Sequence, residues 1–207
     1  TTIALMRENL EIPEPEEIDI VNRKKPQVPP EDFLPFKAEA NSAPPMPEFG
    51  EGYHTLYSLN PHNEKGDINW DPDVFESLYE RVTGKISNNV DKITMVEEYY
   101  LDSVDIGLIT YGSEYRPALE AVEQAREDGI DAGLLKLGTV WPVPEKEIKS
   151  LANKASKILA VEMNIGKYAG EIERVAAGAS DVIRVTKNRG LIHTTNEIYS
   201  EIMEVAK

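Results

Sequence analysis

The feature that most constrains the fold is a regular alternation of apolar and amphipathic segments that begins after Tyr100. The expected strands are the apolar segments 105–112, 131–140, 157–163 and 181–187. Strands that alternate with helix-length segments favour parallel pairing through crossover helices, which cover both faces of the sheet. Near-continuous apolar strands agree with burial on both faces. The sequence therefore predicts a three-layer α/β/α domain with a mostly parallel sheet over residues 101–207.

Apolar spacing and helix-ending glycines indicate where helices lie between these strands. Apolar residues recur three and four positions apart after each expected strand, and Gly129 and Gly178 close two of the helices. An earlier helix is expected to start at Asp71-Pro72, an acidic cap followed by a proline at the first helical position. The apolar positions that support this earlier helix are Phe75, Leu78, Tyr79, Val82 and Ile86.

Prolines divide the rest of the chain. Nine of the 14 lie between Pro13 and Pro47, and such a density excludes a continuous helix or a central strand. We interpret residues 13–70 as an extended connector whose scattered apolar side chains lie along another surface, with disorder as the alternative. Residues 1–12 resemble the end of a larger truncated domain, and residues 71–100 form a connecting helix and its approach to the α/β domain.

The amino-acid composition excludes several classes of partner and site. The formal net charge is −15, the reverse of what a protein needs to displace counterions from nucleic acid. No apolar segment reaches the roughly 20 residues of a membrane span, so we expect neither nucleic acid nor membrane as a partner. The sequence contains no cysteine, which excludes disulfides and thiolate-held clusters from this chain and is consistent with a cytoplasmic protein.

Two segments at strand ends are candidates for ligand contact. Ser113 follows the first expected strand, where a helix start could bind an anion; the sequence favours it as a plain helix cap, because the glycines of a nucleotide loop are missing. Glu162-Met163-Asn164 ends the third strand, at the edge where open α/β sheets bind ligands. Contact with a partner domain and a simple turn into a helix remain the two interpretations of this segment.

No catalytic or metal-binding set can be assembled from the residues themselves. His54, His62 and His193 are far apart and lack metal-ligand spacing. Gly66-Asp67-Ile68 followed by Asn88-Asn89 superficially matches a thiamine diphosphate signature, but the residue after Asp67 is not glycine, so we reject it. His62 is expected to be a turn histidine.

Several segments, taken in order, carry a resemblance to a known family. They are MREN (6–9), NRKKP (22–26), LPFKA (34–38), PPMPEFGEGY (44–53), PHNEKG (61–66), YGSEYRPALEAV (111–122), TVWPVPEKEI (139–148) and VEMNIGKYAGEIERV (161–175). Their order and spacing resemble the carboxyl-terminal half of the α subunit of a 2-oxoacid:ferredoxin oxidoreductase, most closely the 2-oxoglutarate type. The family's His-Asp-Glu-Arg-Gly segment reads His62-Asn63-Glu64-Lys65-Gly66 here.

The resemblance implies an enzyme that decarboxylates a 2-oxoacid to an acyl-CoA and reduces ferredoxin. Its complete form uses thiamine diphosphate, magnesium, an iron–sulfur cluster and coenzyme A. It also implies a transketolase C-terminal-like domain at 101–207, the end of a pyrimidine-binding domain at 1–12, and β and possibly γ and δ subunits as partners, with ferredoxin reached through the complex. We expect this chain alone to bind no cofactor or metal and to be inactive.

The sequence does not assign a catalytic or binding role to any single residue. The candidates that remain are His62, Asn63 and Glu64, in the most polar connector segment, and then Arg7. Alternatives are a pyruvate or branched-chain 2-oxoacid enzyme of the same family and a free-standing binding module. Trp141 is expected to pack against the connector or a partner subunit, and Pro144 to occupy the first position of the following helix.

Overall fold

The computed structural model describes residue 9, residues 11–57 and residues 59–207. It divides into two compact units, the α/β unit (Asp91–Lys207) and the connector unit (Glu8–Val90). Arg7 and most of the segment 1–12 therefore lie outside the described residues. Among the described residues, no helix combines the length and apolar character that a bilayer span requires.

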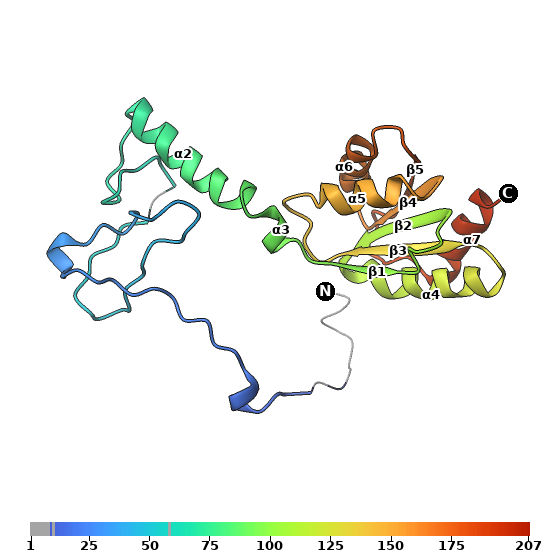
Figure 1. Ribbon diagram of the computed structural model, residues 1–207, viewed down its shortest axis with the longest axis horizontal. Helices are drawn as coiled ribbons and strands as arrows, with labels where there is room; N and C mark the ends of the chain where they lie inside the picture. Colours follow the sequence, from blue (N-terminus) through green and yellow to red (C-terminus); the bar gives the residue numbers. More distant parts are fainter. Residues whose placement is uncertain (1–8, 10, 58) are drawn as a thin grey trace. The chain divides into compact units, whose positions relative to one another are not determined.

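The α/β unit is built on a five-stranded sheet with the order β1-β3-β2-β4-β5 (Figure 1). The strands are β1 (Val96–Tyr99), β2 (Ile106–Tyr111), β3 (Ala132–Leu137), β4 (Lys157–Glu162) and β5 (Asp181–Thr186). The last four are mutually parallel, and β1 pairs antiparallel with β3. The predicted mostly parallel sheet is therefore confirmed, and each predicted strand is present with slightly shorter ends.

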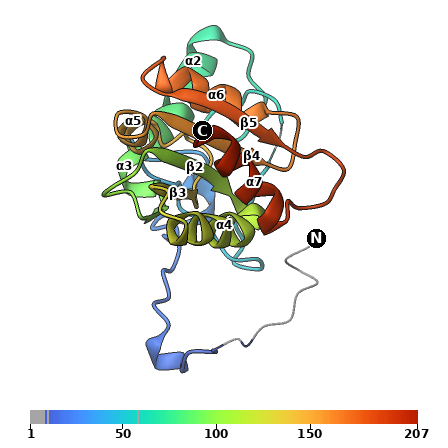
Figure 2. The same cartoon turned by 90° about the vertical axis from the view of Figure 1, so that its right-hand side faces the viewer.

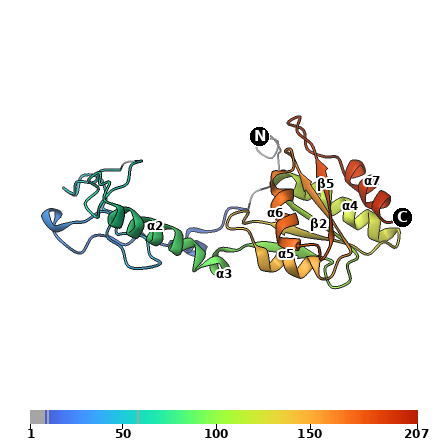
Figure 3. The same cartoon turned by 90° about the horizontal axis from the view of Figure 1, so that it is seen from above.

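Helices cover both faces of this sheet. Figures 2 and 3 show α5 (Glu145–Ala152) and α6 (Lys167–Ala176) on one face and α4 (Tyr115–Glu127) and α7 (Thr195–Val205) on the other. Each face has its own apolar core: Ile148 and Ile172 pack on the first, and Val122 and Ile198 on the second. The three-layer architecture follows from β2, β3 and β4 being buried on both sides.

Strand β1 is a feature that the sequence did not predict. Its residues Val-Glu-Glu-Tyr carry charges in the centre, and residues 71–100 were interpreted as a helix and its approach. The strand forms because its backbone pairs with β3, with Val96 opposite Leu137 and Tyr99 opposite Leu134. The ion pair between Lys136 and Glu97, 2.6 Å apart, adds a cross-strand contact.

The connector unit has little regular structure. It contains two short 3-10 turns, Pro15–Glu17 and Pro30–Asp32, and the helix α2 (Pro72–Ser87), followed by α3 (Val90–Ile93) at the boundary between the units. The predicted start of α2 is confirmed: Pro72 is its first residue, and the Asp71 carboxylate accepts a hydrogen bond from the backbone N–H of Asp73 at 3.0 Å.

Two helix starts differ from the prediction. Ser113 does not cap α4, because a 3-10 turn over Gly112–Glu114 runs directly into the helix and encloses Ser113. Pro144 stands one position before the first residue of α5 and not at it. Pro117 lies in the first turn of α4, where a proline is tolerated.

Candidate site at the carboxyl edge of the sheet

The chain passes from β2 to β3 on one side of β2 and then returns to β4 on its other side. In open α/β sheets, such a reversal opens a crevice at the carboxyl ends of the two strands, where ligands bind. Tyr111 ends β2 and Glu162 ends β4. The carboxyl edge beside these two residues is therefore the candidate site that the topology indicates.

Glu162 is a buried carboxylate, 2% exposed, that faces the start of α6. Its oxygens accept hydrogen bonds from the backbone N–H groups of Tyr168 at 3.1 Å and Ala169 at 3.0 Å. The Tyr111 hydroxyl at 3.1 Å and the Asn164 amide at 2.6 Å donate to the same carboxylate. A negative group suits this position because the unpaired N–H groups of a helix start carry partial positive charge.

Asn164 joins the strand end to the helix. Its side-chain oxygen accepts from the backbone N–H groups of Gly166 at 2.9 Å and Lys167 at 2.8 Å. Its amide also donates to the Tyr111 hydroxyl at 3.0 Å. These contacts support the interpretation of this segment as a turn into a helix; the interpretation as a contact with a partner domain stays a prediction.

Tyr111 and Tyr168 form the aromatic wall of this cluster. Their rings lie 5.4 Å apart at 62°, an edge-to-face arrangement. Burial, followed by the charge of Glu162, raises the pKa of Tyr111 to about 12. Burial also raises the pKa of Tyr168. Both hydroxyls therefore stay protonated near neutral pH, and Tyr111 uses its proton as a donor to Glu162.

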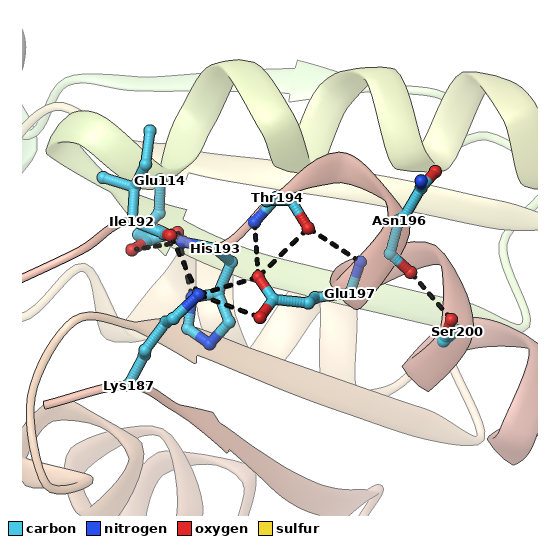
Figure 4. A network of polar contacts seen from close by, with 8 residues as sticks. All are labelled: Glu114, Lys187, Ile192, His193, Thr194, Asn196, Glu197 and Ser200. Carbon is cyan, nitrogen blue, oxygen red and sulfur yellow. Dashed lines mark hydrogen bonds and ion pairs between the residues drawn. The ribbon is translucent and has the colours of Figure 1, made fainter. Parts of the chain in front are cut away.

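A second buried acid lies on the opposite face of the sheet, between α4 and α7. Glu114 is 2% exposed and His193 5% exposed, and the His193 Nδ1 atom lies 3.0 Å from the Glu114 carboxylate (Figure 4). Close to them, Lys187 donates to both Glu197 oxygens at 2.8 and 2.9 Å. A cavity of about 300 Å³ adjoins this network. It is lined by Arg184, Val185, Thr186, Lys187, His193, Glu197 and Glu201.

A larger cavity of about 570 Å³ opens at the carboxyl ends of β2 and β3. Its lining is Gly112, Ser113, Tyr115, Arg116, Pro117, Glu120, Lys136, Leu137, Gly138, Ile192 and Thr195. Ser113 therefore faces a cavity where the sequence predicted a cap. Lys136 is already engaged: its ammonium pairs with Glu97 and lies 4.1 Å from the centre of the Tyr115 ring.

The connector unit brings the sequence-predicted candidates together. His62, Asn63 and Glu64 line a cavity of about 340 Å³. The other lining residues are Phe36, Ala38, Asp73, Val74, Ser77, Leu78 and Arg81. Arg7, the fourth candidate, lies outside the described residues.

The contacts of His62 and Asn63 are those of a compact turn. The His62 ring lies 3.9 Å from the Phe36 ring, and its Nδ1 atom is 3.2 Å from the Asn63 carbonyl oxygen. The Asn63 side-chain oxygen accepts from the backbone N–H groups of Lys65 and Asp67. Gly66 closes the turn at φ +93°, with no room for a β-carbon beside Leu56 and Phe36. The structure thus supports the interpretation of His62 as a turn histidine.

The cofactors implied by the family can be tested against these residues. Within the described parts of the chain, no three His, Asp or Glu side chains are arranged to hold a metal ion. Asp67, the acid of the rejected signature, belongs to the turn of Asn63. An iron–sulfur cluster needs thiolate ligands, and the sequence has no cysteine to supply them. The described residues therefore do not fit a metal-diphosphate site or a cluster.

The sequence did not indicate the roles of Tyr111, Glu114 and Tyr168, and it raised His193 only as a possible metal ligand. The last residue of each buried strand is a usable signal, and it would have placed Tyr111 beside Glu162. The pairing of Glu114 with His193 joins residues 79 positions apart, and no local pattern marks it.

The sequence is similar to those of known proteins. Residues 104–198 match the family described as pyruvate:ferredoxin oxidoreductase core domain II. The 2-oxoglutarate synthase subunit KorA of Methanothermobacter thermautotrophicus is 40% identical over 202 residues, 97% of this chain and 53% of the relative. KorA of Methanocaldococcus jannaschii is 37% identical over 187 residues, 90% of this chain and 50% of the relative.

One solved structure has a fold similar to that of this chain. It is a 2-oxoglutarate:ferredoxin oxidoreductase from Magnetococcus marinus, with a TM-score of 0.75 at 21% identity over 94% of this chain and 34% of that chain. The chain spans about half the length of the curated relatives it matches. The 40% identity to a KorA subunit over 97% of this chain, together with the matched core domain, shows that the chain belongs to the 2-oxoacid:ferredoxin oxidoreductase family.

Proposed function

We propose that the chain is the carboxyl-terminal part of the α subunit of a 2-oxoglutarate:ferredoxin oxidoreductase. The complete enzyme would decarboxylate 2-oxoglutarate oxidatively, form succinyl-CoA and reduce ferredoxin. The observation that carries this proposal is the 40% identity to a KorA subunit over 97% of the chain. A ketoisovalerate oxidoreductase subunit VorB from the same organism is 37% identical over only 53% of the chain, which favours 2-oxoglutarate over a branched-chain 2-oxoacid.

Within that enzyme, the part played by this chain is structural. The two most buried carboxylates, Glu162 and Glu114, are each engaged by hydrogen bonds from helix starts or from His193. Tyrosine hydroxyls are protonated near neutral pH, and burial raises the pKa of both Tyr111 and Tyr168 further. Groups held in this way stabilise the sheet edge. We therefore assign this chain to subunit assembly and to shaping a wall near the active site.

The cofactors of the complete enzyme belong to other parts of it. We propose that thiamine diphosphate, magnesium and the iron–sulfur cluster are held outside this chain's described residues, which lack a metal-ligating set and cysteine. Coenzyme A would be bound by the assembled enzyme. The proposed partners are a β subunit, with γ and δ subunits where the complex has them, and ferredoxin as electron acceptor, in the cytoplasm.

The test is to co-express the complete α subunit with its β subunit and to purify the complex. We expect coenzyme A-dependent reduction of ferredoxin with 2-oxoglutarate and at least tenfold less activity with pyruvate or 2-oxoisovalerate. Equal or higher activity with another 2-oxoacid would contradict the assignment to 2-oxoglutarate. If the chain forms no complex with a thiamine-enzyme subunit, the alternative of a free-standing binding module replaces the proposal.

A further inference from the structure

Helix α2 has one broad apolar face, and its own unit covers only one side of it. Val74 and Leu78 are half-buried and line the connector cavity. Phe75, Tyr79 and Val82 lie on the other side of this face and are 49%, 62% and 45% exposed. These last three residues form the α2 stripe, spaced i, i+4 and i+7 along one side of the helix.

The α2 stripe is organised before any partner binds. The Phe75 and Tyr79 rings are stacked with their centres 6.3 Å apart and their planes at 27°. The cap by Asp71 and the proline at the first position fix the start of the helix. Anchors with this spacing on a preformed helix are those that lie in an apolar groove of a partner protein.

The acidic residues of α2 indicate what kind of partner groove would fit the α2 stripe. Glu76 lies beside the stripe, three residues before Tyr79, and Glu80 follows one turn later on the same exposed side of α2. Neither forms an ion pair with any residue that the structure describes. The whole chain carries a net charge of −15, so a second copy of this chain would bring like charges together at this face. A groove with an apolar floor and a rim of Lys or Arg is complementary to it.

We propose that the α2 stripe docks in an apolar groove of the β subunit, with basic side chains of that groove beside Glu76 and Glu80. This inference rests on the proposed function, because it takes the β subunit as the partner. Burial of two aromatic side chains would provide most of the binding energy, and the two carboxylates would contribute mainly to the rate of association and to specificity.

The test measures the dissociation constant of the complete α subunit and the β subunit by surface plasmon resonance. Phe75→Ser/Tyr79→Ser is expected to raise this constant about tenfold or more. Leu191→Ser is the matched control, because Leu191 is an equally exposed apolar residue, at 64%, in the α/β unit; we expect less than a twofold change. Circular dichroism of the free subunits checks that the helix content is unchanged.

A second variant tests the charges without touching the stripe. Glu76→Lys/Glu80→Lys is expected to slow association at low salt, with the difference shrinking as salt screens the charges. Equal binding by wild type and both variants overturns this inference alone. Absence of binding between the wild-type subunits overturns the proposed function and the inference together. Self-association of the α subunit that Phe75→Ser/Tyr79→Ser abolishes would assign the stripe to a second copy and also overturn the inference.

Discussion

The Glu114 carboxylate binds both the backbone N–H of His193, at 3.1 Å, and the ring Nδ1 of the same histidine, at 3.0 Å. Glu114 directly precedes α4, and His193 lies two residues before α7. The pair therefore ties the starts of the two helices that cover one face of the sheet, as Figure 4 shows for the α7 side. It is the longest-range polar contact within the described core, and its burial makes it sensitive to substitution.

Glu114→Ala is expected to lower the free energy of unfolding by about 2–3 kcal/mol, because it leaves the buried N–H and ring nitrogen of His193 without an acceptor. Urea denaturation followed by circular dichroism measures the change. Glu127→Ala is the control, since Glu127 is exposed near the end of the same helix; we expect a change below about 0.5 kcal/mol. Equal effects of the two substitutions would contradict a stabilising role for the pair.

The sequence predicts most of the α/β unit because burial leaves a distinct apolar pattern in each element. Strands buried on both faces give continuous apolar segments, and helices buried on one face give apolar residues three and four positions apart. It fails at β1, where charges at Glu97 and Glu98 hide a strand whose formation depends on pairing with β3. It also misplaces the starts of α4 and α5, because a 3-10 turn and a proline outside the helix are indistinguishable from caps in the sequence.

The site is less predictable than the fold. Glu162 and Asn164 could be singled out because they follow a strand at the edge where ligands bind. Two of their roles became visible only in three dimensions: both accept hydrogen bonds from the start of α6, and the Asn164 amide donates to the Glu162 carboxylate. His62, Asn63 and Glu64 do line one cavity, yet their contacts are those of a turn, which polarity alone does not distinguish from a reactive site.

Glu162→Gln is expected to lower the pKa of Tyr111 from about 12 while leaving it above the ordinary value of 10.0, because burial is the larger cause and the charge of Glu162 the second. Titration of tyrosine labelled with ¹³C at the ring, followed by NMR, measures the pKa. Tyr111→Phe identifies the signal by its loss. An unchanged pKa in Glu162→Gln would show that the carboxylate charge has no influence on the hydroxyl.

Glu197 predicts a dependence of stability on pH. Its hydrogen bonds with Lys187, and then with Thr194, lower its pKa from 4.5 to about 2. A carboxylate with a lowered pKa in the folded state stabilises the protein above its ordinary pKa, and the contribution is lost as the pH falls toward the folded value. Thermal melting should therefore separate wild type from Glu197→Gln most clearly above pH 4.5, and the two melting temperatures should converge near pH 2. Glu204→Gln, on the exposed side of the same helix, should melt like wild type throughout.

Gly107 and Gly133 face each other across β2 and β3, and both lack space for a methyl group. A β-carbon on Gly107 would lie 2.9 Å from the end of the Leu151 side chain, whereas one on Gly133 would also lie 2.9 Å from the backbone oxygen of Tyr100. Gly133→Ala is therefore expected to cost about 1–3 kcal/mol, and Gly107→Ala less, because a side chain shifts more readily than backbone. Gly170→Ala in α6 meets no atom within 4 Å and should raise the free energy of unfolding by about 0.5–1 kcal/mol through its helix propensity. Chemical denaturation of the three variants measures this order, and a larger loss in Gly107→Ala than in Gly133→Ala would contradict it.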